Sequence, residues 1–201
     1  NQQNIAVMIN GIPFNDMTNG ILYWSNFIGL DEVTRTAQIQ RGLGASRLAI
    51  NSIGGTLNVL TRTADSEKGG YFTLETSNMF DYRATLSLST GKMKGGWAAT
   101  AVITKLQGRG YIEGTPIDSW FWFFSVTKEF KKHLLVLTAL GAPQTHGQRE
   151  SAQTIETWEQ RGLKHNADWG WLGGERFNSR VNFYHKPLIS LNHYWTPNEK
   201  F

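Results

Sequence analysis

Residues 40–63 read QRGLGASRLAINSIGGTLNVLTRT, and this stretch fixes the interpretation of the segments on either side of it. Its first part is rich in small residues and ends at Gly54 and Gly55, and its last part, TLNVLTRT, alternates apolar and polar side chains. Such alternation is typical of a half-buried β-strand. Glycine allows a turn or a close approach of the backbone where a side chain would clash. The stretch therefore predicts a tight turn followed at once by a strand.

The residues before this stretch predict a small mixed unit. IAVMIN, residues 5–10, alternates like a strand and ends at a turn over residues 10–13. Asp31 and Glu32 suit the positive end of a short helical turn, and TAQIQRG, residues 36–42, reads as another strand. Three or four short strands joined by glycine turns predict a small α+β unit that ends near residue 63.

The pattern changes from Gly69 onward, where the strand-length runs become longer. In YRATLSLS, residues 82–89, apolar and polar side chains alternate strictly. A period of two predicts a strand with one apolar face and one wet face. The polar side chains, which we expect to line a wet lumen, are Arg83, Thr85, Ser87 and Ser89.

About six such runs predict an antiparallel meander whose connections differ between its two ends. Residues 91–96 and 131–132 form short turns, whereas residues 108–118 and 148–182 are longer and rich in tryptophan, glycine and charge. Transmembrane β-barrels combine short turns on one side with longer loops on the other. The first hairpin is an exception, because its tight turn near Phe80 falls at the end with long loops.

A soluble β-sandwich is the alternative to a barrel. A sandwich would join its apolar faces in one core, and it rarely keeps serine, threonine and arginine along a whole inner face. The composition also favours the barrel, because 8 Trp, 6 Tyr and 11 Phe occur with 21 Gly at a mean hydropathy of −0.36. Aromatic girdles on a polar-lined sheet account for that mixture.

The sequence also argues against several kinds of site and partner. It contains no cysteine, which excludes a disulfide framework and a thiolate metal site. The 20 basic residues give a net charge of +4 without a dense cluster, so we expect no nucleic-acid partner. The acidic residues offer no pair suited to general acid–base catalysis. The five histidines are His133, His146, His165, His185 and His193. They lack metal-ligand spacing such as HExxH, so we expect no enzyme activity, metal or cofactor.

The opening stretch resembles the end of the plug domain of TonB-dependent outer-membrane receptors. In that family a strand ending in RG, a small-residue helical turn, a Gly-Gly pair and a strand of the type I/L-N-V/I-x-T-K/R complete the plug. VMINGIPFNDMTNG, residues 7–20, looks like the strand and turn that lead to the apical plug loop. HNADWGWLGG and NFYHKPLISLNHYW, residues 165–174 and 182–195, look like receptors of this family from Bacteroidota.

The resemblance implies two domains. Residues 1–66 would be the C-terminal part of the plug, and residues 67–201 the first strands and outer loops of a transmembrane β-barrel. The family's energy-coupling box and first plug strands are missing, and Leu48-Ala49 replaces the usual Tyr-Gly. Barrels of outer-membrane transporters have ~22 strands and a plugged lumen, and open sheet edges do not occur in lipid. We therefore expect the chain to be a fragment with an incomplete barrel.

The function that the resemblance implies is active import across the outer membrane of a Gram-negative cell. A small ligand, such as a metal chelate, glycan or peptide, would bind between the outer loops and the top of the plug. The plug would then shift or partly unfold when a TonB-type inner-membrane energy transducer pulls on it, which suits its short, glycine-rich strands. The expected partners also include outer-membrane lipid and a surface lipoprotein.

Three sets of residues follow as candidates for these contacts. Arg41 is placed, by resemblance, to pair with barrel carboxylates, with a solvated strand end as the alternative. The second set lies on the outer loop and would bind substrate or a partner, or pack loop against loop: Trp158, His165, Asp168, Trp169 and Trp171. The third set lies on the apical plug loop and would bind substrate, or pack against the barrel wall: Asn15, Asp16, Asn19, Tyr23 and Trp24.

Two other functions stay open. A barrel that acts as a scaffold in a larger complex, without transport, would keep the plug but need no ligand-shaped loops. A soluble glycan-binding sandwich would use exposed tryptophans and need no membrane.

Overall fold

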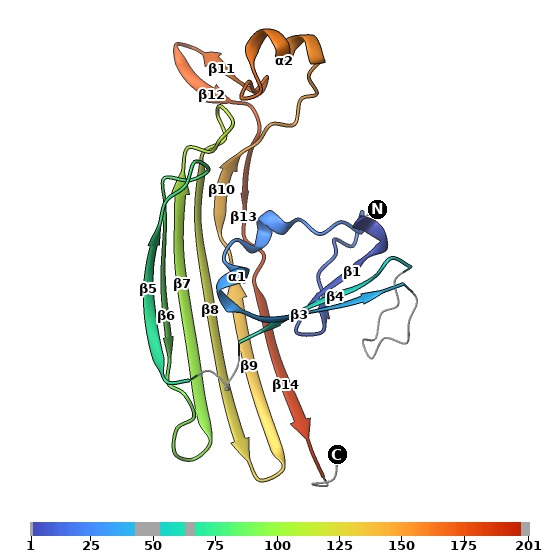
Figure 1. Ribbon diagram of the computed structural model, residues 1–201, viewed down its shortest axis with the longest axis vertical. Coiled ribbons are helices and arrows are strands. Elements are labelled where there is room, and N and C mark those ends of the chain that lie inside the picture. The colour runs from blue at the N-terminus through green and yellow to red at the C-terminus, as the bar shows by residue number, and fades with distance from the viewer. Residues whose placement is uncertain (1, 43–52, 63–66, 198–201) are drawn as a thin grey trace.

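The computed structural model describes residues 2–42, 53–62 and 67–197. The fold is mainly β, with antiparallel strands and an unclosed barrel, as predicted. Figure 1 shows a small sheet lying against one face of a tall, curved sheet. We call the described residues up to 62 the plug and residues 67–197 the wall. The helical turn predicted within residues 43–52 lies outside the described residues.

The plug is a four-stranded sheet in the order β2-β1-β4-β3. β1 runs parallel to β4, and the other neighbours are antiparallel. β1, β3, β4 and α1 confirm the predicted strands and helical turn, whereas η1, η2 and the short strand β2 were not predicted. The plug elements are η1 (Gln2–Asn4), β1 (Ala6–Ile9), β2 (Ile12–Pro13), η2 (Trp24–Phe27), α1 (Leu30–Val33), β3 (Thr34–Arg41) and β4 (Gly55–Thr61).

The turn before β4 has the predicted physical cause. A side chain on Gly54 would come within 2.6 Å of the carbonyl oxygen of Asn4. Gly55 has a φ of +108°, and a side chain there would collide with the carbonyl oxygen of Gln40. Both positions therefore require glycine, because η1 and β3 pass close to the turn on its two sides.

The wall is a meander of six long strands, two of which are interrupted once. β9 and β10 both pair with β8, and they are separated only by Ala142 and Pro143. β13 and β14 continue the next long strand around Pro187, since a proline lacks the N–H that a ladder needs. The wall elements are β5 (Gly69–Glu75), β6 (Tyr82–Ser89), β7 (Trp97–Gly108), β8 (Ile117–Phe130), β9 (His133–Gly141), β10 (Gln144–Gly147), β13 (Val181–Tyr184) and β14 (Leu188–Trp195).

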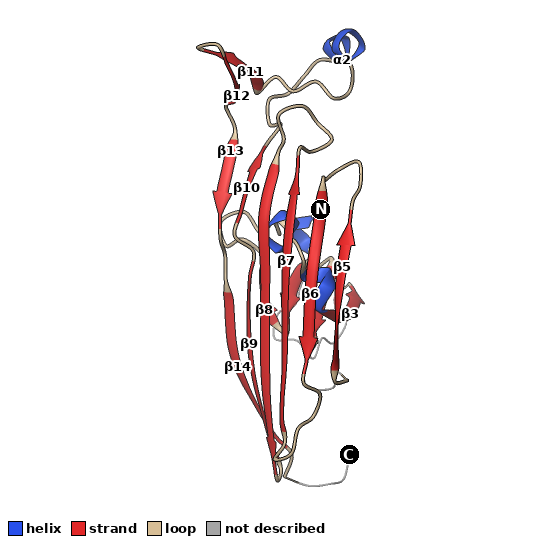
Figure 2. Cartoon of the chain, turned by 90° about the vertical axis from the view of Figure 1, so that its left-hand side faces the viewer, coloured by secondary structure: helices blue, strands red, loops and turns tan. Residues whose placement is uncertain are grey.

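The two ends of the wall differ as the sequence predicted (Figure 2). At one end, the turn end, β8 and β9 are joined by Lys131 and Lys132 alone. The other end, the loop end, carries residues 76–81, 109–116 and 148–180. The longest of these loops is not irregular throughout, because it contains a helix and a hairpin: α2 (Ile155–Arg161), β11 (Trp169–Leu172) and β12 (Glu175–Asn178).

The inward face of the wall carries an apolar row on which the plug packs. Val102, Phe123, Leu140 and Leu188 stand side by side on four neighbouring strands. They share one buried core with apolar residues of η2, α1, β1 and β4, among them Phe27. The plug and the wall are therefore joined by a hydrophobic core rather than by polar contacts alone.

A row of hydroxyl groups crosses the same face, one inward-facing position closer to the turn end than the apolar row. Its members stand in register on five strands, and we call them the hydroxyl row: Ser89, Thr100, Ser125, Thr138 and Ser190. The side-chain oxygens of Ser125, Thr138 and Ser190 are buried without a hydrogen-bond partner in the described structure. Buried hydroxyls are normally paired, so this row marks a polar seam in the plug–wall interface.

The outward face of the wall is apolar and exposed. Leu86, Ile103 and Leu191 are more than two-fifths exposed, and tryptophans stand toward both ends of the strands. Lys128 lies 4.7 Å over the ring of Trp97, and Lys105 lies 5.0 Å over the ring of Trp120. An exposed apolar band between aromatic girdles is the surface of a membrane barrel. Its exposure excludes the β-sandwich alternative, in which this face would be buried.

Among the described residues, no helix is long and apolar enough to cross a membrane.

Candidate functional site

A cavity of about 280 Å³ lies where the plug meets the loop end of the wall. Ser25 and Ile28 reach it from the plug, around η2, and β10 supplies Gln144 and His146. The loop between β7 and β8 supplies most of the remainder. The residues that line this loop-end cavity are Ser25, Ile28, Met79, Gly110, Tyr111, Ile112, Thr115, Ile117, Gln144, His146 and Gly147.

The polar groups of the loop-end cavity are oriented by contacts with the plug. The side-chain amide of Gln144 donates to the carbonyl oxygen of Ser25, which fixes its orientation. The amide oxygen of Gln144 then lies 3.2 Å from Nδ1 of His146 and can only accept. Nδ1 of His146 is therefore the donor, and its Nε2 is left to accept a hydrogen bond in the neutral imidazole. The site thus depends on where the plug places Ser25.

The plug loop below the cavity is held together by the predicted residues themselves. Asn15 accepts from the backbone N–H of Val7 (2.7 Å) and donates to the carbonyl oxygens of Ile5 and Gly20 (both 2.9 Å). These bonds occupy the Asn15 side chain in shaping its own loop. Its predicted contact with substrate stays a prediction.

The other predicted plug residues lie nearer the surface. The backbone N–H of Thr18 donates to the Asp16 carboxylate (2.9 Å) and lowers its pKa, and Lys186 of the wall lies 3.8 Å away. Asn19 donates to the hydroxyl of Tyr23 (2.8 Å). Tyr23 and Trp24 are nearly half exposed and immediately precede Ser25 of the cavity. Neither ring lines the loop-end cavity, and the predicted contact of these residues with substrate stays a prediction.

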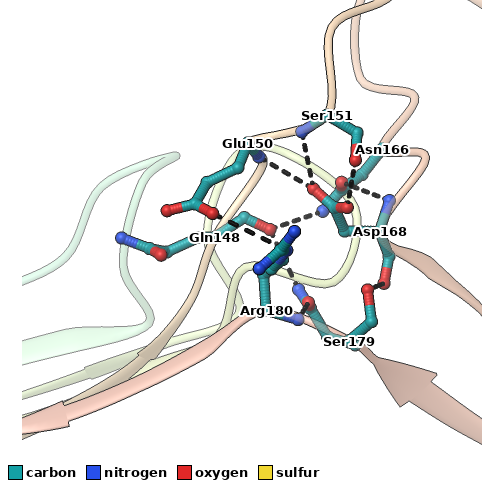
Figure 3. A network of polar contacts seen from close by, with 8 residues as sticks. Gln148, Glu150, Ser151, Asn166, Asp168, Ser179 and Arg180 are labelled. Carbon is teal, nitrogen blue, oxygen red and sulfur yellow. Dashed lines mark hydrogen bonds and ion pairs between the residues drawn. The ribbon is translucent and has the colours of Figure 1, made fainter.

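The long outer loop is anchored by Asp168, as Figure 3 shows. Its carboxylate accepts from the hydroxyl and N–H of Ser151 (2.5 and 3.0 Å) and from the N–H of Glu150 (2.8 Å). The hydroxyl of Ser151, followed by the two N–H groups, lowers the pKa of Asp168. These contacts are the loop packing that the sequence left as the alternative role for this residue.

Two further anchors, Asn166 and Asn178, were not recognised in the sequence. The fully buried amide of Asn166 donates to the carbonyls of Glu113 (2.8 Å) and Gln148 (3.1 Å), and its oxygen accepts from Asp168 N–H (3.0 Å). Asn178 donates to the same carbonyl of Gln148 (3.1 Å). The only local signal was the N-A-D spacing of residues 166–168, which suits a turn closed by an asparagine side chain.

The tryptophans predicted on the outer loop mostly pair with cations. Arg176 lies 4.7 Å over the ring of Trp171 and 5.7 Å over that of Trp169, and Arg149 lies 5.7 Å over Trp158. Trp171 remains two-thirds exposed. The N–H of His165 donates to the carbonyl of Gly162 after α2. The structure brings these residues to the loop end but none of them lines the loop-end cavity.

The ion pair between plug and wall uses residues other than Arg41. Arg41 is exposed at the end of β3, and no ion pair among the described residues includes it. Arg83 of β6 instead contacts Asp31 and Glu32 of α1, each at 2.8 Å. Tyr71 donates to Glu32 (3.1 Å) beside this pair. The role predicted for Arg41 stays a prediction.

The other residues predicted to line the lumen share the inward face with Arg83. Thr85 is fully buried and its hydroxyl lies 3.0 Å from that of Thr104, while Ser87 is buried in the apolar row. Ser89 belongs to the hydroxyl row and lies 3.3 Å from Thr100. In this part of the molecule the plug covers the face on which they stand.

A larger cavity, of about 500 Å³, lies at the turn end between the plug sheet and the wall. Asn10, Arg35 and Thr61 border it from the plug, and Thr138 and Tyr194 are among its wall residues. It lies at the opposite end of the strands from the outer loops. In the described part of the chain no group of three or more His, Cys, Asp or Glu could hold a metal ion.

The comparisons with known proteins rest on structure alone. No protein-family model matches this sequence, and none of the curated proteins does. The ferric-catecholate import receptor Fiu of E. coli K12 matches over 99% of this chain and 30% of its own, with a TM-score of 0.68 and 14% identity. The ferric citrate transporter FecA matches over 98% of this chain and 29% of its own, with a TM-score of 0.68 and 14% identity.

A third solved structure extends the same likeness. The ferripyoverdine receptor of the Pseudomonas aeruginosa outer membrane matches over 75% of this chain and 22% of its own, with a TM-score of 0.56 and 13% identity. The chain thus spans less than a third of the length of each of these proteins. Its fold is that of the plug and adjoining barrel strands of a TonB-dependent outer-membrane receptor.

Proposed function

We propose that this chain is part of an outer-membrane receptor that binds a small ligand at the loop-end cavity and imports it past the plug with TonB-coupled energy. The observation that carries the proposal is that the plug and the wall build this cavity together, through Ser25 and Gln144. A ligand bound there touches both bodies. Its presence therefore changes the contacts that hold the plug in place.

The route of import is supported by the polar seam below the cavity. The hydroxyl row leaves three buried hydroxyls without partners, and it adjoins the turn-end cavity, which Thr138 of this row borders. Weakly satisfied polar contacts separate at lower cost than a fully paired interface. When a TonB-type partner pulls the plug, we expect this seam to open first and to lead the ligand toward the turn end.

The surroundings of the receptor follow from its two outer surfaces. The exposed apolar face between the aromatic girdles would contact outer-membrane lipid. Residues 148–180 project beyond the strands and are ordered by Asp168 and Asn166, so they offer a firm surface for a lipoprotein lid. The loop end would then face the outside of a Gram-negative cell and the turn end its periplasm.

A thiol-directed label tests ligand binding without a change elsewhere in the chain. These 201 residues contain no cysteine, so in a receptor whose other cysteines are replaced by serine, Ser25→Cys places one environment-sensitive fluorophore at the cavity. Outer membranes that contain the labelled protein would be titrated with ferric citrate, a ferric catecholate chelate and a mixture of neutral oligosaccharides. We expect a saturable change with one of them, and uptake of that probe that stops when a proton uncoupler is added.

The matched control is Lys94→Cys, which lies exposed on a turn-end loop and away from the cavity. Its fluorophore should not respond. A saturable signal at both labels, or at neither, would contradict binding at the loop-end cavity. Correct insertion in the outer membrane without any binding would favour the scaffold alternative.

A further inference from the structure

We propose that the binding surface of this chain is built for an uncharged, hydroxyl-rich ligand of the oligosaccharide class rather than for an anionic ferric chelate. This inference rests on the proposed receptor function and names its substrate. It differs from what the structural neighbours bind, since Fiu and FecA are described as a ferric-catecholate receptor and a ferric citrate transporter.

The lining of the loop-end cavity lacks formal charge. No Lys, Arg, Asp or Glu is among the described residues that border it. Its polar side chains are Ser25, Tyr111, Thr115, Gln144 and His146. The amide of Gln144 is engaged with Ser25 and His146, so the groups left for a ligand are the hydroxyls and the acceptor Nε2 of His146, which can pair with the hydroxyls of a sugar. A polyanion in this cavity would lose water without gaining a countercharge.

The described loops of this chain around the cavity do not supply that countercharge. The plug loop 14–26 and the loop-end segments 76–81, 109–116 and 148–187 hold seven Lys and Arg against eight Asp and Glu, a net formal charge of −1. The whole chain has a net charge of +4, so its basic excess lies elsewhere. A site that attracts anions by long-range steering carries a positive excess around its mouth.

The cations that are present at the loop end are already engaged. Six of the seven contact a carboxylate or lie over an aromatic ring: Arg109, Arg149, Lys164, Arg176, Arg180 and Lys186. Lys164 is the one that approaches the cavity lining, because it lies 4.7 Å over the ring of Tyr111. An anion would have to compete with these contacts for each charge.

Exposed aromatic rings complete the surface that a sugar requires. Tyr111 lines the cavity and is 46% exposed, and Tyr23 and Trp24 present rings beside Ser25 on the plug. Rings that are apolar on their faces bind the apolar faces of pyranose units, while the hydroxyls and the imidazole of the lining bind the hydroxyl edges. Exposed rings together with uncharged polar groups favour neutral sugars over chelates whose negative charge requires arginine or lysine.

The test is calorimetry on the native protein purified from outer membranes in detergent. The two probes are a mixture of neutral malto-, cello- and xylo-oligosaccharides, and ferric citrate. We expect saturable binding of the neutral mixture, with an affinity that changes less than about twofold between about 20 mM and about 300 mM NaCl, because screening does not act on an uncharged ligand. Binding of ferric citrate alone would overturn the inference and leave the receptor function standing. Binding of neither probe would also overturn the inference, and the receptor function would then depend on the titration with the ferric catecholate chelate.

Three variants locate the effect at the cavity. Tyr111→Ala should weaken oligosaccharide binding by about tenfold, because it removes the stacking ring. Tyr111→Phe keeps the ring and should bind within about threefold of the native protein. Lys164→Gln should also stay within about threefold, whereas an anionic ligand held by this lysine would lose about tenfold or more. A large loss with Lys164→Gln, or no loss with Tyr111→Ala, would contradict the proposal.

Discussion

The buried side chains that hold the outer loop show how single polar residues set its order. Asn166 makes three hydrogen bonds and is fully buried, so Asn166→Ala leaves the carbonyl of Glu113 and the N–H of Asp168 without these partners, while the carbonyl of Gln148 keeps its bond from Asn178. We expect the loop to lose about 2–3 kcal/mol of local stability. Hydrogen exchange of residues 148–180 measures this directly. Glu156→Ala on exposed α2 is the control, and equal protection in both variants would contradict the anchoring role.

The Asp168 anchor gives the loop a defined dependence on pH. Its pKa is lowered by the Ser151 hydroxyl and the two N–H groups, so its stabilising effect is complete above the ordinary aspartate pKa. The effect is lost as the pH falls through the lowered, folded-state pKa. We therefore expect the loop to stay closed at about pH 5 to 7, which is one unit or more above the ordinary aspartate pKa of about 3.9. The loop should open only in stronger acid. The rate of protease cleavage in the loop should rise only in this acid range, and Asp168→Asn should remove the dependence of cleavage on pH. Cleavage that already increases near neutral pH would refute the anchoring role of the Asp168 carboxylate.

At the level of strands, Thr→Val substitutions at two buried positions should change the free energy of unfolding in opposite directions. Thr138 is buried without a partner, so Thr138→Val should be neutral or raise the free energy of unfolding by up to about 1 kcal/mol. Thr85 pairs with Thr104 at 3.0 Å, so Thr85→Val should lower it by about 1 kcal/mol. Thermal unfolding in detergent compares the two. A loss of stability with Thr138→Val would mean that its hydroxyl is satisfied, for example by an ordered water.

The ion pair between α1 and β6 should connect the plug to the wall energetically. Arg83 and Glu32 have side chains only 14% exposed, so their coupling should exceed that of a surface pair and amount to about 1 kcal/mol or more. A double-mutant cycle with Arg83→Gln and Glu32→Gln, read from the denaturant midpoint of plug release, measures it. Additive effects would show that the pair does not hold the plug.

Secondary structure was largely predictable because each element has a local signal. The alternation in residues 82–89 gave the two faces of β6, and Gly54 and Gly55 gave the turn before β4. The site was less predictable, because its parts meet only in three dimensions. Ser25, Gln144 and His146 come from distant segments and carry no motif, and the interruption at Pro143 that separates β9 from β10 was not foreseen. Asn15 and Asp168 are among the residues predicted to contact substrate, but the hydrogen bonds that they make mainly organise their own loops.

At the scale of the whole molecule, the proposed function requires that a ligand enters at the loop end and passes only if the plug moves relative to the wall. One apolar core and several polar contacts join these two bodies, including the pair Asp16 and Lys186. A reversible tether between those two positions should therefore separate binding from transport. It leaves the loop-end cavity intact, because neither residue lines it.

The measurement that tests this most directly is uptake by cells whose receptor carries Asp16→Cys and Lys186→Cys bridged by a reducible bis-methanethiosulfonate. The probe is the one that binds in the fluorescence titration. If the proposed function is right, the bridged protein binds this probe with the affinity of the same double-cysteine variant before bridging but does not import it, and a reducing agent restores import. Import by the bridged protein at the rate of the unbridged one would contradict it.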